Sequence, residues 1–510
     1  MSLYSDIVKG GNMKTYFDYI DEINADDLYK GLLGHGLFAE KLPPVFTSED
    51  FYNYCISNNP TFADKGRQYV YYESMRNINI PRPLGVPTPM AYQKLCKHLS
   101  DEWGQIKNHF ESKTMNQTHK VSRIHIRKMH NEDKLFEMSY DDWRNDGAPE
   151  NKLIYGMKYA VHADISKCFP SIYTHSLPWA LVGKTTAKQT KNNKKLWYNK
   201  IDHLTQNTKD METHGLIIGP HASNVLSEII LCAVDEKLVS DVWKYIRNID
   251  DYTCFVESEE RAEIFLTELQ SELREYDLSL NHKKTVITKL PNAMVEQWVR
   301  KIKAISLLTS YGKVDYKNCQ TYLDYAIEIA EKEKGNASVL NFAIKTLSGM
   351  PLTDNAKQYE KEIVFHLCVL YPYLVTILDD YVFSQCNTTV DEIQNLSQKL
   401  FGNGIEQKLY EQSSYTLYFA VKYNFVLNID VDEIIKAKDC VLLALSYIYC
   451  QKNKMVSEIK QLKDYARSFK NIPEDFERMW IFAYEILPES DLRDEWKPLK
   501  HAKVSFIRSV

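Results

Sequence analysis

Paired aspartates are the residues of this sequence best suited to hold a divalent metal ion. Two carboxylate oxygens suit Mg²⁺ and leave water and phosphate to complete its coordination shell. Asp-Asp occurs four times, at Asp26-Asp27, Asp141-Asp142, Asp250-Asp251 and Asp379-Asp380. Taken alone, such a pair is usually a solvated turn. Asp250-Asp251 differs because strand-like segments flank it, YIRNI before and YTCFV after. We expect this pair at a hairpin tip, from which both carboxylates can converge on a metal.

Asp164 supplies the further carboxylate that a site with two metals about 3.5–4 Å apart would need for in-line attack on a phosphate. It follows KYAVHA, residues 158–163, which we predict to be a core strand. Phe169 stands five residues later. An isolated aspartate in this position could equally cap the N-terminus of a helix.

A glycine-bounded segment is the next candidate for ligand contact. HGLIIGPHASNVLSEIILCAVDEKL, residues 214–238, has Gly215, Gly219 and Pro220 before an apolar-periodic run. Glycine allows the backbone to approach a ligand closely. We expect a helix over 215–240, with the glycines at its entrance.

Several further elements must position these residues. Residues 121–128, VSRIHIRK, alternate between apolar and basic side chains, which predicts a strand with Arg123 and Arg127 on a basic face. Strand candidates also lie across 245–257 and 278–289, with an amphipathic helix over 259–276 between them. Residues 184–209 form a polar insertion rich in Lys, Thr and Asn.

Composition limits the function classes. A length of 510 residues predicts two to four domains. Hydrophobic residues make up 44% and charged residues 26%, values of a folded globular protein, and the few Gly and Pro favour helices. The net charge is −5 and neither half of the chain is basic, which disfavours a protein that binds a long nucleic-acid duplex. Ten cysteines without a C-x-x-C pair indicate reduced thiols, and no segment is long enough to span a membrane, so we expect a cytoplasmic protein.

Four blocks, in this order along the chain, resemble the polymerase motifs of reverse transcriptases. They are DISKCFPSI (164–172), GLIIGPHASNVL (215–226), NIDD (248–251) and LSLNHKKT (278–285). The resemblance implies that Asp164, Asp250 and Asp251 are catalytic metal ligands for Mg²⁺, or alternatively Mn²⁺. Asn248 replaces the tyrosine usual in the third motif but leaves both aspartates intact.

The same resemblance assigns roles at the nucleotide. It implies that Phe169 screens the ribose 2′-hydroxyl, that Gly219 lies beside the nucleotide and template position, and that Lys284 is a candidate proton donor to pyrophosphate. Arg123 and Arg127 fall where the fingers of these enzymes present side chains to the triphosphate.

Nearly the whole chain resembles a narrower group, the abortive-infection (Abi) polymerases of bacterial phage defence, such as those of P2-like prophages. GLFAEKLPPVFTSEDFYNY and PRPLGVPTPMAYQKLCKHL carry this resemblance together with the palm motifs and the helical C-terminal region. It implies a bacterial cytoplasmic enzyme that polymerises dNTPs without a template. It also implies priming on a protein hydroxyl, so that a single-stranded DNA product is attached through a tyrosine, and assembly into a homo-oligomer, a trimer or hexamer.

The expected fold is an α+β right-hand polymerase, with reverse-transcriptase-like fingers and palm, followed by an all-α helical-repeat (HEAT-like) domain. We expect an N-terminal extension over 1–75, fingers and palm over 76–300, and the helical domain over 301–510. The last helical segment has aromatic residues and little sign of the polar outer face that ends a helical stack, which favours burial of this segment against a second copy of the chain. These aromatic residues are Trp480, Phe482, Trp496 and Phe506. Two other functions stay open: a template-copying, retron-like reverse transcriptase, and a non-catalytic scaffold that binds a phage protein.

Overall fold

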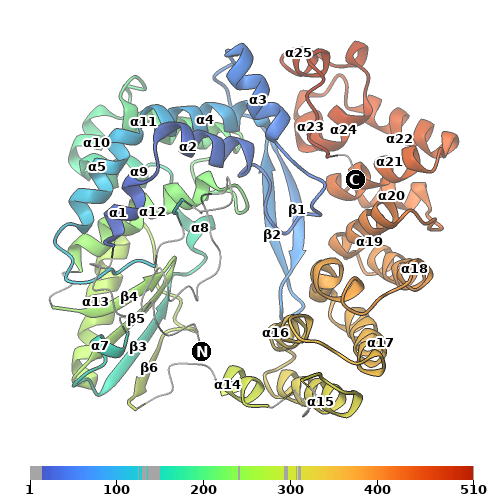
Figure 1. Cartoon of the computed structure of the whole chain (residues 1–510). Helices are drawn as coiled ribbons and strands as arrows, with labels where there is room; N and C mark the ends of the chain where they lie inside the picture. The colour runs from blue at the N-terminus through green and yellow to red at the C-terminus, as the bar shows by residue number, and fades with distance from the viewer. Residues whose placement is uncertain are drawn as a thin grey trace. The chain divides into compact units, whose positions relative to one another are not determined.

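The chain forms two compact units, each built from separated segments (Figure 1). The protein is described from a computed structural model, which describes residues 14–123, 126–128, 135, 150–238, 242–291, 297–305, 307 and 312–508. The first unit comprises Met1–Leu37, Thr61–Gly66 and Pro89–Asn292. The second comprises Phe38–Pro60, Arg67–Thr88 and Ala293–Val510. The first 75 residues are therefore shared between the units, and the division into extension, fingers with palm and helical domain stays a prediction.

A four-stranded antiparallel sheet organises the first unit. Its order is β4-β5-β3-β6, and the strands are β3 (Tyr159–Asp164), β4 (Lys244–Asn248), β5 (Asp251–Val256) and β6 (Val286–Lys289). The strands expected over 158–163 and across 245–257 are confirmed, and the expected helix over 259–276 is α13 (Glu259–Glu275), which packs against β3 and β5. Between 278 and 289 only the last four residues are strand.

Helices complete the first unit. Those used below are α1 (Tyr16–Asp21), α4 (Pro89–Asp101), α5 (Trp103–Thr114), α8 (Cys168–Ser171), α9 (Ser176–Val182), α10 (Lys184–Thr190), α11 (Trp197–Asn207) and α12 (Ala222–Lys237). The helix expected over 215–240 thus begins only at Ala222, after Pro220. The polar insertion at 184–209 is folded into α10 and α11. Almost every residue of α12 is buried, so this helix runs through the core of the unit.

The second unit contains a β-hairpin, β1 (Tyr69–Met75) with β2 (Pro81–Pro87), and a succession of helices. The main helices are α15 (Tyr316–Lys332), α16 (Ala337–Ser348), α17 (Asp354–Leu370), α18 (Val390–Glu406), α19 (Tyr410–Tyr423), α21 (Cys440–Lys452), α22 (Val456–Ser468) and α24 (Trp480–Ile486). Neighbours along the chain pack together, for example α18 on α19 and α19 on α21. The described residues beyond 297 contain no named strand, so this region is helical as expected, while its HEAT-like repeat stays a prediction.

The aromatic residues near the C-terminus are buried inside the second unit. Trp480, Phe482 and Phe506 are 0% exposed and Trp496 is 6% exposed. The early segment of the unit covers them, because Phe51 packs on Phe506 at 5.7 Å between ring centroids. Two backbone hydrogen bonds fix this pairing: the N–H of Thr47 donates to Phe506 O at 3.0 Å, and that of Arg508 to Val45 O at 2.7 Å. The prediction that these aromatic side chains are uncovered is therefore wrong, and they give no argument for a homo-oligomer.

Two smaller expectations concern cysteines and membrane spans. All ten cysteines are buried and free, as expected for reduced core thiols. Within the described residues, no helix combines the length and the apolar character that a membrane crossing requires.

Candidate active site

The turn between β4 and β5 carries the aspartate pair. Asn248 and Asp251 face each other across the hairpin, so Ile249 and Asp250 form a two-residue turn. Ile249 has φ 55°, in the left-handed region that a β-branched residue rarely adopts. Such a conformation costs on the order of 1–3 kcal/mol and persists only where the surroundings hold it. The geometry of this hairpin tip therefore depends on its contacts.

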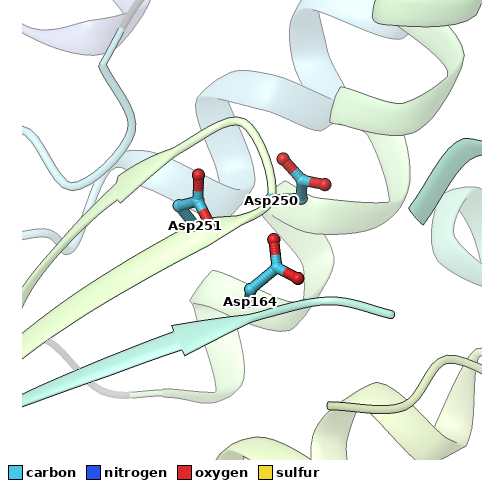
Figure 2. A group of neighbouring side chains, drawn as sticks. All are labelled: Asp164, Asp250 and Asp251. Atoms are coloured by element: carbon cyan, nitrogen blue, oxygen red, sulfur yellow. The ribbon is translucent and has the colours of Figure 1, made fainter. Parts of the chain in front are cut away.

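Three carboxylates meet at this turn (Figure 2). Asp164 ends β3 and lies opposite Asp251 in the β3–β5 register. One carboxylate oxygen each from Asp164, Asp250 and Asp251 lie within 4.8 Å of one another. Asp164 is 7% exposed and Asp250 half-buried, whereas Asp251 reaches solvent. The structure thus brings together the three residues that the sequence suggested as metal ligands.

The electrostatics of this cluster favour a cation. Partial burial, a hydrogen bond with Asp164 and the negative charge of Asp250 together raise the pKa of Asp251 to about 7. Asp251 therefore keeps a proton below about pH 7, because three negative charges at this distance repel one another. Hard carboxylate oxygens with solvent access on one side are the donor set that Mg²⁺ prefers. The residues present fit a divalent metal ion.

The fourth motif lies against Asp164. Asn281 donates from Nδ2 to Asp164 Oδ2 at 2.9 Å, and its backbone N–H donates to Asp164 O at 2.7 Å. Lys284 donates from Nζ to Asp164 Oδ1 at 3.1 Å, although its side chain is 65% exposed. Asn281 therefore orients Asp164, while Lys284 places a mobile positive charge beside the cluster.

The first two motifs are joined by their backbones. The N–H of Leu216 donates to Phe169 O, and that of Gly215 to Ile172 O, both at 2.8 Å. Gly215 has φ 86°, and a Cβ there would lie 2.8 Å from Pro170 O, so a side chain would not fit. Gly219 has φ 128°, which also favours glycine.

Phe169 directly follows Cys168, whose pKa is affected by the charge of Asp250. Burial and then the negative charge of Asp250 raise the pKa of the Cys168 thiol. Phe169 follows it on α8 and is half-buried. Its role at the sugar stays a prediction.

The basic strand expected over 121–128 does not form among its described residues. Ser122 makes one isolated bridge, to Arg247, and belongs to no named strand. Arg127 is only 4% exposed, so it does not share an open basic face with Arg123, whose guanidinium pairs with Glu150. The central residues of the pattern, 124 and 125, lie outside the described residues.

The sequence analysis missed a buried ion cluster beneath the hairpin. Arg247 on β4 is 0% exposed, and Glu228 and Asp235 on α12 are 1% and 2% exposed. The guanidinium donates to Asp235 Oδ2 from Nε at 2.9 Å and from Nη2 at 2.7 Å. It donates to both oxygens of Glu228 at 3.0 Å. The two carboxylates hold the pKa of Arg247 well above its usual value although burial opposes this, so the residue stays charged.

The fifth donor of this guanidinium reaches the catalytic turn. Arg247 Nη1 donates to Ile249 O at 2.9 Å, at the residue with positive φ. Glu228 Oε1 also accepts from Tyr16 on α1 at 2.9 Å and from Ser122 at 3.0 Å. The sequence did contain a signal for this cluster. Glu228 and Asp235 are seven residues apart in the apolar run of α12, and that spacing puts both on one face of the helix.

The comparisons with known proteins identify the domain. Residues 82–326 match the family model described as "Reverse transcriptase (RNA-dependent DNA polymerase)". No curated protein matches the sequence.

Two solved telomerase structures from Candida Tropicalis are similar at 11% identity. One, in complex with a fragment of telomeric RNA, has a TM-score of 0.29 and covers 75% of this chain and 68% of that chain. The other, the apo telomerase, has a TM-score of 0.31 with 88% and 74% covered. Scores this low support neither a shared architecture nor a shared function. From the family match alone, the chain contains a reverse transcriptase domain over residues 82–326, and this domain indicates a nucleotidyltransferase.

Proposed function

We propose that this nucleotidyltransferase is a DNA polymerase that adds deoxynucleotides through two divalent metal ions, with Asp164, Asp250 and Asp251 as their protein ligands. The convergence of these carboxylates within 4.8 Å is the observation that supports the proposal. Magnesium fits the oxygen donors, and Mn²⁺ would fit the same set. The ions would neutralise the charge that builds on the phosphate.

The residues around the aspartates have separate tasks in this reaction. A hydroxyl oxygen attacks the α-phosphorus of a dNTP, the bond to the leaving oxygen breaks, and pyrophosphate departs. Lys284 can turn from Asp164 towards the leaving group and donate a proton to it, because its ammonium is exposed and already beside the cluster. Asn281 keeps Asp164 oriented meanwhile. Phe169 would lie under the sugar, and Gly219 would let the backbone approach the nucleotide.

Replacement of Asp250 by Asn tests the site. The amide keeps the shape but removes the charge that would hold the metal, so nucleotide incorporation should fall by at least about 100-fold. Asp26→Asn is a matched control, because Asp26 belongs to another Asp-Asp pair and is exposed on a surface helix. Full incorporation by Asp250→Asn in magnesium would contradict the site assignment.

Within this function, we propose synthesis without a template and a role in abortive infection. Both ideas rest on the resemblance to Abi polymerases, and the net charge of −5 agrees with an enzyme that does not hold a long duplex. Purified protein should polymerise dNTPs with no added template. If it extends a primer faithfully on RNA and is idle without it, the retron-like alternative is correct. A chain inactive with every metal and substrate, yet able to bind a phage protein, would favour the scaffold.

Protein priming and homo-oligomer assembly are part of the same proposal. A strand begun on a tyrosine hydroxyl would stay attached to the protein. Mass spectrometry after protease and nuclease digestion should then find a nucleotide on one tyrosine. DNA that separates completely under denaturing conditions would contradict priming but not the metal site. Light scattering would test the oligomer.

A further inference from the structure

One segment of the first unit is strongly positive although the chain as a whole is acidic. Residues 165–201 contain seven lysines and no aspartate or glutamate, whereas the net charge of the chain is −5. The segment starts directly after Asp164 and runs through α8, α9 and α10 to the start of α11. The positive charge is therefore local, and Phe169, which has a proposed role at the active site, lies in the same segment.

Five lysines of this segment are exposed and have no carboxylate partner among the described residues: Lys167, Lys188, Lys191, Lys194 and Lys195. Four of them lie on α10 or in the turn that follows it. Lys188 lies on α10, and Lys191, Lys194 and Lys195 lie in the turn before α11. The neighbouring Lys184 differs, since its ammonium donates to Glu275 O at 3.1 Å. An ammonium group without a carboxylate partner gains electrostatic energy from an anionic ligand.

Half-buried aromatic rings lie beside these lysines. Tyr173 contacts His175 and Trp179, with ring centroids 4.7 and 5.8 Å apart. Lys188 Nζ lies 5.8 Å from the centre of the Trp179 ring, and Lys184 Nζ lies 4.5 Å from it. These rings and lysines therefore form one continuous group.

This combination fits a single strand of nucleic acid. Each lysine that neutralises a phosphate releases counterions, and aromatic rings stack on unpaired bases regardless of sequence. The apolar faces that a protein or membrane partner would need are absent here, because the exposed residues of α10 and the following turn are Lys, Thr, Gln and Asn.

We propose that Tyr173, Trp179, Lys188, Lys191 and Lys195, here called the lysine surface, bind the single-stranded DNA that the enzyme produces. The identity of the strand rests on the proposed function, but binding itself does not require catalysis. The lysines hold phosphates of the strand, and the rings contact its bases. The surface thereby retains the growing product on a protein that is otherwise acidic.

The first test measures binding without synthesis. The full chain carrying Asp250→Asn is titrated with a fluorescent single-stranded oligothymidine at several salt concentrations. The variant Lys188→Gln, Lys191→Gln, Lys195→Gln in that background should bind about 100-fold more weakly at 0.1 M salt. The slope of log K against log salt should fall by about 2, because each phosphate contact on a single strand contributes ~0.7. An unchanged slope would overturn the proposal.

A matched control removes three exposed lysines elsewhere on the same unit. Lys65→Gln, Lys152→Gln, Lys289→Gln changes the net charge equally and should leave the slope unchanged, because these three lysines are exposed and have no ion pair with the described residues. An equal loss of slope in this control would mean general charge attraction and would overturn the lysine surface. Urea unfolding of both triple variants should match the parent, because all six side chains are outside the core. Trp179→Ala should weaken binding by about 5-fold or more at an unchanged slope, as expected for lost stacking.

A second measurement separates this proposal from the proposed function. With Asp164, Asp250 and Asp251 intact, the variant Lys188→Gln, Lys191→Gln, Lys195→Gln should add the first nucleotide at the parental rate but release shorter products. Parental product lengths would contradict the lysine surface and leave the polymerase assignment standing. Conversely, full synthesis by Asp250→Asn would contradict the metal site while the salt slopes still report on the surface.

Discussion

Replacement of Arg247 by lysine should damage catalysis although this residue is buried and touches no substrate. All five N–H groups of its guanidinium are used: two donate to Asp235, two to Glu228 and one to Ile249 O. Lysine keeps the charge but has only three donors, so at least two charge-assisted hydrogen bonds are lost. At ~1.5–3 kcal/mol each, the free energy of unfolding should fall by about 3–6 kcal/mol.

The effect on catalysis comes from the turn. The left-handed conformation of Ile249 costs on the order of 1–3 kcal/mol, and a hydrogen bond to a charged donor contributes a similar amount. Without that bond the turn can relax, and Asp250 and Asp251 move with it. A displacement of ~1 Å at a catalytic group can cost about 100-fold in rate. We therefore expect Arg247→Lys to lower kcat by about 10- to 100-fold and to require more magnesium, with little change in KM for the dNTP.

The assay is single-nucleotide incorporation as a function of magnesium concentration, per folded protein and well below the unfolding temperature. Tyr16→Phe is the matched control, because it removes one hydrogen bond to Glu228 from the same cluster without touching Ile249. It should lower stability by about 1 kcal/mol and leave the magnesium dependence unchanged. If Arg247→Lys is destabilised yet keeps the parental kcat and magnesium dependence, the cluster only stabilises the fold and the positioning argument is wrong.

Two further predictions concern the sugar and buried acids. Phe169→Ala should raise the use of ribonucleotides relative to deoxynucleotides by about 10- to 200-fold, measured by competition, and unchanged discrimination would mean that another residue screens the 2′-hydroxyl. Glu360 is 0% exposed, and burial raises its pKa to about 7 from 4.5, so the unfolded state binds fewer protons between these values and stability falls as pH rises. Glu360→Gln should therefore stabilise the protein against urea by up to about 3 kcal/mol at pH 8 and much less at pH 5. A gain that is equal at both pH values would exclude this carboxyl as the cause.

The aspartate site was predictable because its signals are local. Apolar flanks around Asp250-Asp251 predicted a hairpin, and the apolar run before Asp164 predicted a strand, both of which form. The order of the four motifs, which resembles that of reverse transcriptases, then predicted that Asp164 lies at the same edge of the sheet as Asp250 and Asp251. The final geometry depends on a register, Asp164 opposite Asp251, that the pattern of each strand alone does not determine.

Long-range packing is the part that the sequence did not reveal. Arg127 looked like part of an exposed basic face, yet it is buried, since two-residue periodicity says nothing about what covers each face. Trp480 and Phe506 looked uncovered because their partners, among them Phe38, lie more than 400 residues earlier in the chain. Arg247 escaped notice because a single arginine in a strand usually faces solvent.

The discontinuous second unit also has a consequence for biosynthesis. Residues 45–51 cannot complete their packing until Phe506 and its neighbours leave the ribosome, which happens only after 455 further residues have been made beyond Phe51. At ~5–20 residues per second, the nascent Phe38, Phe46 and Phe51 stay without their final neighbours for on the order of half a minute or more. Exposed apolar segments of this kind are binding sites for chaperones and starting points for aggregation. We therefore expect the yield of folded protein to depend on the translation rate and on chaperone supply more than on the stability of the finished molecule.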